Sequence, residues 1–305
     1  MAIMILSLGL LAACGGKDNN SSSSGDKGED GGKKEEPKTE EKGEAGSLNI
    51  SGSSAMQPLV ASAAEEFKKK NPNADIQVTA GGSGQGLSDV SKGTVNIGNS
   101  DVFAEEKEGI PAEELEDHKI AVVGMAPVVN PETGVKEISK ADLIKVFTGE
   151  IKNWKELKGK DQKIVLVNRP DSSGTRATFV KYALDGKTPA EGVTEDSSNT
   201  VKKIISETEG AIGYLAFSYL SDDTVTALSV DGVEPKEENV INGEFPIWAY
   251  QHSYTKGKPE GLAKEFIDFM MTEEIQEGVL KKEGYIPASK MKVERDAEGK
   301  QKDIK

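Results

Sequence analysis

The chain has 305 residues, of which 35% are hydrophobic and 30% are charged, and its formal net charge is −14 at pH 7. This length favours about two domains. The acidic charge argues against nucleic acid as a partner, because binding to a phosphate backbone calls for a basic surface. The single cysteine, Cys14, excludes an intramolecular disulfide and a cysteine zinc cluster. The two histidines, His118 and His252, are too few and too scattered for a histidine metal site, so we interpret both as structural or surface residues and expect neither metal nor cofactor.

The first 13 residues, MAIMILSLGLLAA, form an apolar run that is too short to span a bilayer as a stable helix. The run ends in Leu-Ala-Ala directly before Cys14, which resembles the bacterial lipoprotein signal, cut before a cysteine that then carries lipid. The resemblance implies a signal peptide over residues 1–13, lipidation of Cys14 and a place at the extracytoplasmic face of the cell membrane. Residues 14–46 are rich in Ser, Gly, Lys and Glu and nearly free of apolar side chains, so we expect a disordered linker.

Strand and helix patterns alternate from Leu48 onward. The predicted strands cover residues 47–50, 75–80, 94–98, 118–130 and 163–167, and the predicted helices cover 55–72, 87–93 and 139–150. Such alternation favours a parallel α/β architecture. We expect residues 243–254, GEFPIWAYQHSY, to form a strand and crossover packing, and residues 290–305 to form a solvated end.

Three strands run into Ser/Gly clusters that open helices, namely SGSSA at 51–55, GGSGQG at 81–86 and DSSGT at 171–175. Free N–H groups at a helix start, together with the peptide dipoles, favour an anion. Glycine permits close approach of the backbone, and serine adds a hydroxyl donor. Arg169, just before the third cluster, supplies a planar cation that matches a tetrahedral oxyanion. The pattern therefore indicates an anion-binding site.

Several enzyme motifs are absent from the sequence. It contains no G-x-x-x-x-G-K-[ST] phosphate loop, GGSGQG does not fit G-x-G-x-x-G, and no G-x-S-x-G surrounds Ser83 or Ser173. With two histidines and no motif around either, a serine-hydrolase triad is improbable.

Three segments together, ISGSSAMQPL, TAGGSGQGLSDVSKGTVNIGNSD and NRPDSSGTRATF, resemble the phosphate-binding proteins of Pst-type ABC importers. VFTGEIKNW and EGAIGYLAFSYL are also similar to that family, so the resemblance runs from about Leu48 to Ala288. It implies a type II periplasmic-binding-protein fold, with two α/β lobes joined by two hinge crossovers that close on one ligand. We expect lobe I to comprise residues 47–125 and 248–305, and lobe II to comprise residues 126–247. The implied partners are inorganic phosphate and the membrane permease subunits of a phosphate ABC importer, and the body is expected to be monomeric.

The resemblance also implies which residues bind phosphate. The residues carried over from the family are Ser53, Ser54, Ala55, Ser83 and Asp101 from one lobe, and Arg169, Ser173, Gly174 and Thr175 from the other. It further suggests that Asp171 holds Arg169 in place and does not touch the ligand.

Asp101 is the informative position, because a carboxylate next to an anion is unfavourable unless the ligand carries a proton. An ionised Asp can only accept hydrogen bonds. Monobasic or dibasic phosphate can donate one, whereas sulfate cannot and would leave the buried carboxylate unsatisfied, at a cost of roughly 1–3 kcal/mol or more. The carboxylate would therefore select phosphate by rejecting sulfate.

Other functions stay open at this point. A binding protein for another oxyanion, such as sulfate or molybdate, would use similar donors, although Asp101 argues against it. An extracellular phosphatase would also grip phosphate, but it needs a nucleophile with a base, or metal ligands, and the sequence displays no such set. We therefore expect a receptor and not an enzyme, and a second role in sensing or adhesion is compatible with the sequence.

Overall fold

The computed structural model describes residues 46–304. The predicted signal peptide, Cys14 and the predicted linker up to residue 45 lie outside the described residues. Over the described range, every helix is too short or too polar to cross a bilayer.

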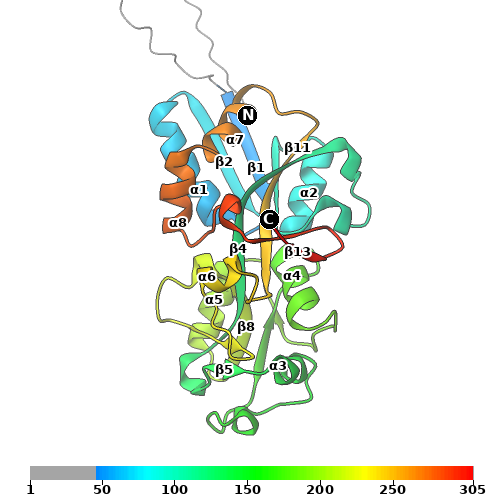
Figure 1. The fold of residues 1–305 in the computed structure, drawn as a ribbon, viewed down its shortest axis with the longest axis vertical. Coiled ribbons are helices and arrows are strands. Elements are labelled where there is room, and N and C mark those ends of the chain that lie inside the picture. The colour runs from blue at the N-terminus through cyan, green and yellow to red at the C-terminus, as the bar shows by residue number, and fades with distance from the viewer. Residues whose placement is uncertain (1–45, 305) are drawn as a thin grey trace, which may run out of the picture. The chain divides into compact units, whose positions relative to one another are not determined.

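A mixed sheet runs through the body from end to end (Figure 1). Its strands, in spatial order, are β2 (Ala74–Ala80), β1 (Gly46–Gly52), β3 (Ile97–Ser100), β11 (Trp248–Lys256), β4 (Leu115–Val129), β8 (Ala211–Ala216), β6 (Val165–Asn168) and β7 (Val193–Thr194), with β9 (Thr226–Ala227) paired to β4. The pairs β1–β2, β1–β3, β6–β8 and β6–β7 are parallel, as the alternating pattern predicts. The pairs that involve β4 or β11 are antiparallel, so the sheet is mixed and only partly of the parallel type that the alternation favours.

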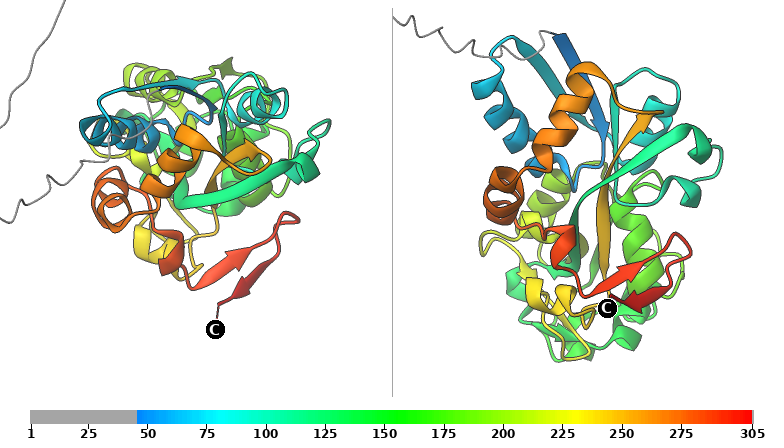
Figure 2. Two further views of the ribbon diagram at one scale, coloured as in Figure 1. Left: turned by 90° about the horizontal axis from the view of Figure 1, so that it is seen from above. Right: turned by 45° about the horizontal axis from the view of Figure 1, so that its top comes forward.

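Strands β4 and β11 connect the two halves of the body. Residues 115–124 of β4 pair with β11, whereas residues 125–129 pair with β8 in the other half. The chain leaves the first half along β4 and returns along β11, so the two strands run in opposite directions. This return path explains the antiparallel pairs. It also brings together segments that are distant in sequence, at the place where β4 and β11 pass from one half to the other (Figures 1 and 2).

The helices cover both faces of the sheet. They are α1 (Gln57–Lys70), α2 (Ser83–Ser91), α3 (Lys140–Phe147), α4 (Gly174–Ala183), α5 (Ser198–Glu207), α6 (Glu237–Ile241), α7 (Gly261–Met270) and α8 (Leu280–Lys282). The short strands β5 (Glu137–Ile138) and β10 (Ser229–Val230) form a separate parallel pair. Helix α1 packs on β2 and α7, α2 on β1 and β3, and α5 on β8 and β6. The predicted cap of α3 is confirmed, because the Ser139 hydroxyl accepts a hydrogen bond from the N–H of Asp142 at 3.0 Å.

Each half has an aromatic group in its core. Phe67 of α1 meets Phe266 and Phe269 of α7 edge to face, at centroid distances of 5.5 and 5.3 Å. In the other half, Phe179 of α4 stacks on Tyr214 of β8 at 4.3 Å. Burial of such rings is the main favourable term for these helix contacts. It helps to hold α1 and α4, the helices that follow the first and the third Ser/Gly clusters.

The C-terminal segment is ordered and packs on the body, so the expectation of a solvated end is wrong. Strands β12 (Val293–Arg295) and β13 (Gln301–Asp303) form an antiparallel hairpin. Arg295 is buried and donates to the carbonyls of Trp248, at 2.9 Å, and Pro246, at 3.1 Å. The sequence is polar here because one face of the hairpin is exposed, and a long charged side chain supplies much of the contact on the other face.

Candidate functional site

The first cluster forms the turn between β1 and α1. The hydroxyl of Ser53 accepts hydrogen bonds from the N–H groups of Ala55, at 3.1 Å, and Met56, at 3.3 Å. It also donates to the carboxylate of Asp101. Ser53, Ser54 and Ala55 are all buried. Tyr219 and Tyr285 donate to the carbonyls of Ser54 and Ala55, which fixes the turn from the outside.

The second cluster opens α2 earlier than predicted. The helix starts at Ser83, and Gly82 before it has φ of 84°, a conformation that glycine adopts without strain. The first turn of α2 therefore lies within the glycine-rich stretch, which the sequence analysis placed before the helix. The buried hydroxyl of Ser83 accepts a 2.9 Å hydrogen bond from the N–H of Asp101. Ser83 thereby positions Asp101 at the end of β3.

The third cluster opens α4. Ser173 is the N-cap, with its hydroxyl accepting from the N–H of Arg176 at 3.2 Å. Gly174 lies so close to the second cluster that a Cβ there would be 2.1 Å from Oγ of Ser83 and 2.9 Å from Cβ of Asp101. Only glycine fits this contact. The openings of α2 and α4, predicted as separate anion-binding features, therefore meet face to face.

Asp101 lies where the three openings converge. It is 3% exposed, and it accepts hydrogen bonds from Ser53 and from Oγ1 of Thr175, the latter at 3.0 Å. Burial raises the pKa of this carboxyl above its usual value, while the hydrogen bonds of Ser53, Thr175 and Gln251 and the charge of Arg169 oppose the increase.

Arg169 is the cation of the site and is only 1% exposed. Its guanidinium donates to the hydroxyls of Ser198 and Ser54, each at 3.1 Å, and to the carbonyl of Asp196. Its Nε is buried and has no hydrogen-bond partner among the described residues. Burial lowers the pKa of Arg169, but the charge persists because an arginine titrates far above neutral pH. Ser53 thus contacts the carboxylate of Asp101, and the next residue, Ser54, contacts the guanidinium of Arg169.

Asp171 is not placed as the sequence suggests. Its side chain is 96% exposed, and its carboxylate lies 3.1 Å from Nε of Arg176. Arg176 in turn donates to the carbonyl of Arg169 at 3.0 Å. The guanidinium of Arg169 is held by hydroxyls and a carbonyl, and Asp171 is not among these partners. Asp171 lies in the turn before α4, which begins at Gly174, and its side chain faces solvent there.

Ser198 belongs to the site although the sequence analysis does not name it. It begins α5, is fully buried and lies 3.0 Å from Oγ of Ser54. The sequence does contain a signal for Ser198, because DSSNT at 196–200 resembles the Ser-rich helix openings of the other clusters. The preceding strand, β7, has only two residues, so this opening does not follow an obvious apolar run.

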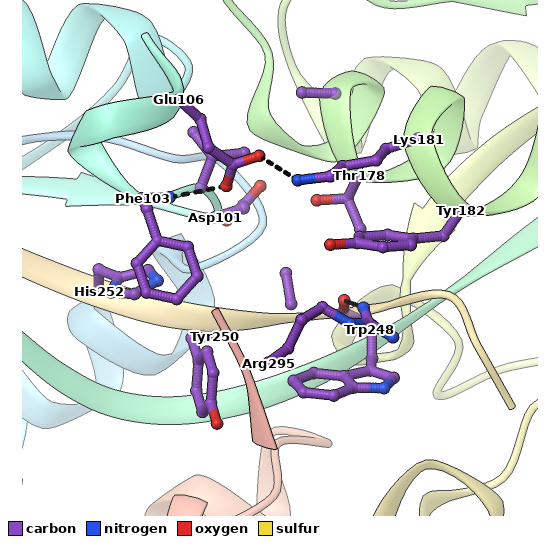
Figure 3. A pocket seen from close by; sticks show the side chains of 13 residues that line it. Asp101, Phe103, Glu106, Thr178, Lys181, Tyr182, Trp248, Tyr250, His252 and Arg295 are labelled. Carbon is purple, nitrogen blue, oxygen red and sulfur yellow. Dashed lines mark hydrogen bonds and ion pairs between the residues drawn. The ribbon is translucent and has the colours of Figure 1, made fainter. Parts of the chain in front are cut away.

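A pocket lies next to Asp101, which forms part of its lining (Figure 3). Its walls come from the segment after β3, from α4 and from β11, and the side chains of Glu106 and Lys181 meet across it. Over residues 46–304, no three His, Cys, Asp or Glu side chains form a group that could hold a metal ion. The site is thus built from hydroxyls, backbone N–H groups, one arginine and one carboxylate.

Known proteins share this sequence and architecture. Residues 37–274 match the model of the PBP superfamily domain. The chain is 72% identical over 264 residues to the phosphate-binding protein PstS of Bacillus subtilis, covering 87% of this chain and 88% of that protein.

Solved structures agree with this relationship. A substrate-binding protein of Clostridium perfringens, solved with bound phosphate, superposes with a TM-score of 0.74 at 34% identity, covering 80% of this chain and all of that one. An ABC-type phosphate transport receptor of Vibrio cholerae has a TM-score of 0.62 at 26% identity, covering 78% of this chain and 99% of that one. The expected fold, two α/β lobes joined by two crossovers, is confirmed. The chain belongs to the PstS family of phosphate-binding proteins, within the PBP superfamily.

Proposed function

We propose that this chain binds inorganic phosphate between its two lobes and delivers it to the membrane permease subunits of an ABC importer. The name of the Bacillus subtilis relative and the phosphate in the Clostridium perfringens structure support this assignment. The ligand contacts are Ser53, Ser54, Ala55, Ser83, Asp101, Arg169, Ser173, Gly174 and Thr175. Ser198 joins them as a residue that orients Arg169 and Ser54.

The observation that supports this function best is the burial of Arg169 and Asp101 around one serine-rich turn. The guanidinium and the helix N–H groups favour a tetrahedral oxyanion. The ionised carboxylate favours an oxyanion that still bears hydrogen, because it can only accept. Dibasic phosphate meets both requirements at neutral pH, whereas sulfate meets only the first.

The affinity follows from the number of charge-assisted hydrogen bonds. Each contributes roughly 1.5–3 kcal/mol, and desolvation and lobe closure offset much of the sum. We expect a Kd of about 1 μM or tighter, which corresponds to about −8 kcal/mol.

Isothermal titration with phosphate, sulfate and molybdate tests the proposal. The protein should bind phosphate and reject sulfate by at least about a hundredfold, since a buried unsatisfied carboxylate costs about 3 kcal/mol. In Asp101→Asn this ratio should fall sharply while the fold persists. Equal selectivity in the two proteins would refute the role of Asp101, and tighter binding of sulfate or molybdate than phosphate would refute the function itself.

The receptor is proposed to have no hydrolytic activity. Among the described residues, neither imidazole is paired with a serine that it could activate as a nucleophile. His252 Nδ1 lies 2.7 Å from Asp117, and His118 Nε2 lies 3.2 Å from the hydroxyl of Thr255. A chromogenic phosphate ester should therefore be hydrolysed no faster with the protein than without it. Measurable turnover that disappears in Arg169→Lys would indicate a phosphatase.

We propose lobe I at residues 47–125 and 248–305, lobe II at 126–247, a monomeric body, and a lipid on Cys14 that holds the protein at the extracytoplasmic face of the cell membrane. Cys14→Ser should release the protein from the membrane fraction of expressing cells, and analytical ultracentrifugation should give the monomer mass for residues 46–305.

A further inference from the structure

Two segments, one from each predicted lobe, meet at three points. The first segment, residues 101–107, follows β3, and the second, residues 171–181, contains most of α4. At the ligand site, Thr175 donates to Asp101 at 3.0 Å. Outside it, Lys107 Nζ donates to the carbonyl of Asp171 at 3.1 Å, and Lys181 Nζ lies 2.8 Å from Oε2 of Glu106. Any motion that separates the segments must break all three contacts.

The ion pair of Lys181 and Glu106 is partly shielded from solvent, and each of the two side chains makes a further hydrogen bond. The two side chains are 32% and 23% exposed. The other carboxylate oxygen of Glu106 accepts a hydrogen bond from the N–H of Phe103 at 3.2 Å, which orients it toward α4. Nζ of Lys181 also donates to the carbonyl of Ala297 at 3.1 Å. Figure 3 shows the pair reaching across the pocket beside Asp101.

The C-terminal hairpin ties this end of α4 to the crossing strand β11. The guanidinium of Arg295 lies between two aromatic rings, 3.8 Å from the centroid of Tyr182 and 4.1 Å from that of Trp248. Tyr182 follows Lys181 on α4, and Trp248 begins β11. Figures 1 and 2 both place the hairpin beside α4. The hairpin therefore supports Lys181 in two ways, through the carbonyl of Ala297 and through the stacking of Arg295 on Tyr182.

We propose that Lys181 and Glu106 form a latch that holds the lobes closed, and that the C-terminal hairpin positions Lys181 for it. The proposal rests on the proposed function, since closure matters because it retains a ligand. The latch residues touch no ligand and exist as a pair only in the closed arrangement. They shift the population toward the closed form, so they strengthen the binding of any anion by the same factor. Asp101, in contrast, changes the ratio between anions.

The test compares Lys181→Met and Glu106→Gln in the full chain. Glutamine keeps an oxygen for the N–H of Phe103 but removes the charge, so it isolates the ion pair. Both variants should raise the phosphate Kd by about two- to fivefold, which is the range for a partly exposed ion pair. The increase should appear in the dissociation rate measured by stopped flow, and the ratio of phosphate to sulfate affinity should not change. The exchange Lys181→Glu with Glu106→Lys should restore part of the lost affinity.

A matched control is the ion pair of Lys202 and Asp222, which has the same 2.8 Å separation but lies within predicted lobe II. Lys202→Met should leave the phosphate Kd unchanged. If Lys181→Met raises the Kd no more than Lys202→Met does, the latch is refuted. A fluorescence energy-transfer pair across the lobes, read without ligand, should also report a more open Lys181→Met protein. This readout separates a failure of the latch from a failure of phosphate binding itself.

The role of the hairpin is tested with Arg295→Lys, which keeps the charge but loses the planar stacking. It should weaken phosphate binding in the wild-type background and have no further effect in the Lys181→Met background, because both act through one contact. Arg295→Met serves as a second variant, and circular dichroism checks that both remain folded. An equal effect of Arg295→Lys in the two backgrounds would overturn this role.

Discussion

Oγ1 of Thr175 donates a 3.0 Å hydrogen bond to Oδ2 of Asp101, although the two residues lie 74 positions apart in the chain. Thr175 is in the first turn of α4, and Asp101 follows β3 in the other half of the body. This bond brings the third Ser/Gly cluster onto the carboxylate that Ser53 also contacts, while the N–H of Asp101 donates to the hydroxyl of Ser83. Two of the proposed ligand contacts, Thr175 and Asp101, therefore also join the two halves of the body.

The raised pKa of Asp101 predicts how stability depends on pH. Burial raises the pKa of this group in the folded protein. Its stabilising contribution is therefore complete below the ordinary carboxyl pKa of about 3.9 and is lost as the pH rises through the folded value. Asn does not titrate, so ligand-free Asp101→Asn should gain Tm relative to the wild type as the pH rises above the ordinary carboxyl pKa of about 3.9. Thermal unfolding after removal of phosphate measures this difference.

Asp222 provides a control of opposite sign. A hydrogen bond from Lys202 and further bonds from Thr224 lower the pKa of Asp222 to about 2. Its contribution is present above the ordinary carboxyl pKa of about 3.9 and is lost as the pH falls through the folded value of about 2. Asp222→Asn should therefore be no more stable than the wild type at neutral pH. Parallel pH curves for Asp101→Asn and the wild type would contradict the interpretation of Asp101.

Gly174→Ala should block closure with little effect on the separate lobes. The new Cβ would lie 2.1 Å from Oγ of Ser83. Relief of such overpacking costs about 1–3 kcal/mol, so the phosphate Kd should rise about ten- to a hundredfold while the Tm of the ligand-free protein changes little. Gly278→Ala is the control, because a Cβ there meets nothing within 4 Å. An unchanged Kd in Gly174→Ala would show that the two helix openings do not meet in the bound form.

Ser198→Ala should weaken phosphate binding about tenfold. The hydroxyl of Ser198 accepts from Arg169 and lies 3.0 Å from Oγ of Ser54, and a hydrogen bond to a charged group contributes roughly 1.5–3 kcal/mol. Ser197→Ala is a matched control, because the Ser197 side chain makes no capping hydrogen bond. Titration calorimetry compares the two. Similar Kd values for both variants would exclude Ser198 from the site.

Arg169→Lys and Asp171→Asn should differ greatly in effect. The guanidinium of Arg169 reaches two hydroxyls and a carbonyl at once, which an ammonium cannot reproduce. We expect a loss of at least about a hundredfold in phosphate affinity, since several charge-assisted bonds are lost. Asp171 is 96% exposed, so Asp171→Asn should change the Kd by no more than about twofold. A large effect of Asp171→Asn would instead support the sequence-based suggestion that Asp171 holds Arg169 in place.

The sequence by itself determined the α/β class, the strands β1, β2, β3, β4, β6 and β11, the cap at Ser139 and the three Ser/Gly helix openings. These features depend on local properties, such as apolar periodicity, capping hydroxyls and glycine turns, which a few neighbouring residues suffice to specify. The resemblance to known phosphate-binding proteins then indicated which openings act together.

Only the tertiary structure decided the antiparallel crossing of β4 and β11, the membership of Ser198, the outward position of Asp171 and the packing of the C-terminal hairpin. Each depends on which distant segments meet. A two-residue, exposed strand such as β7 gives little local signal, and the burial of Arg295 follows from its packing between Tyr182 and Trp248. The physical reason is that burial changes the environment of a charged side chain, and burial is a property of the assembled fold, which local sequence does not specify.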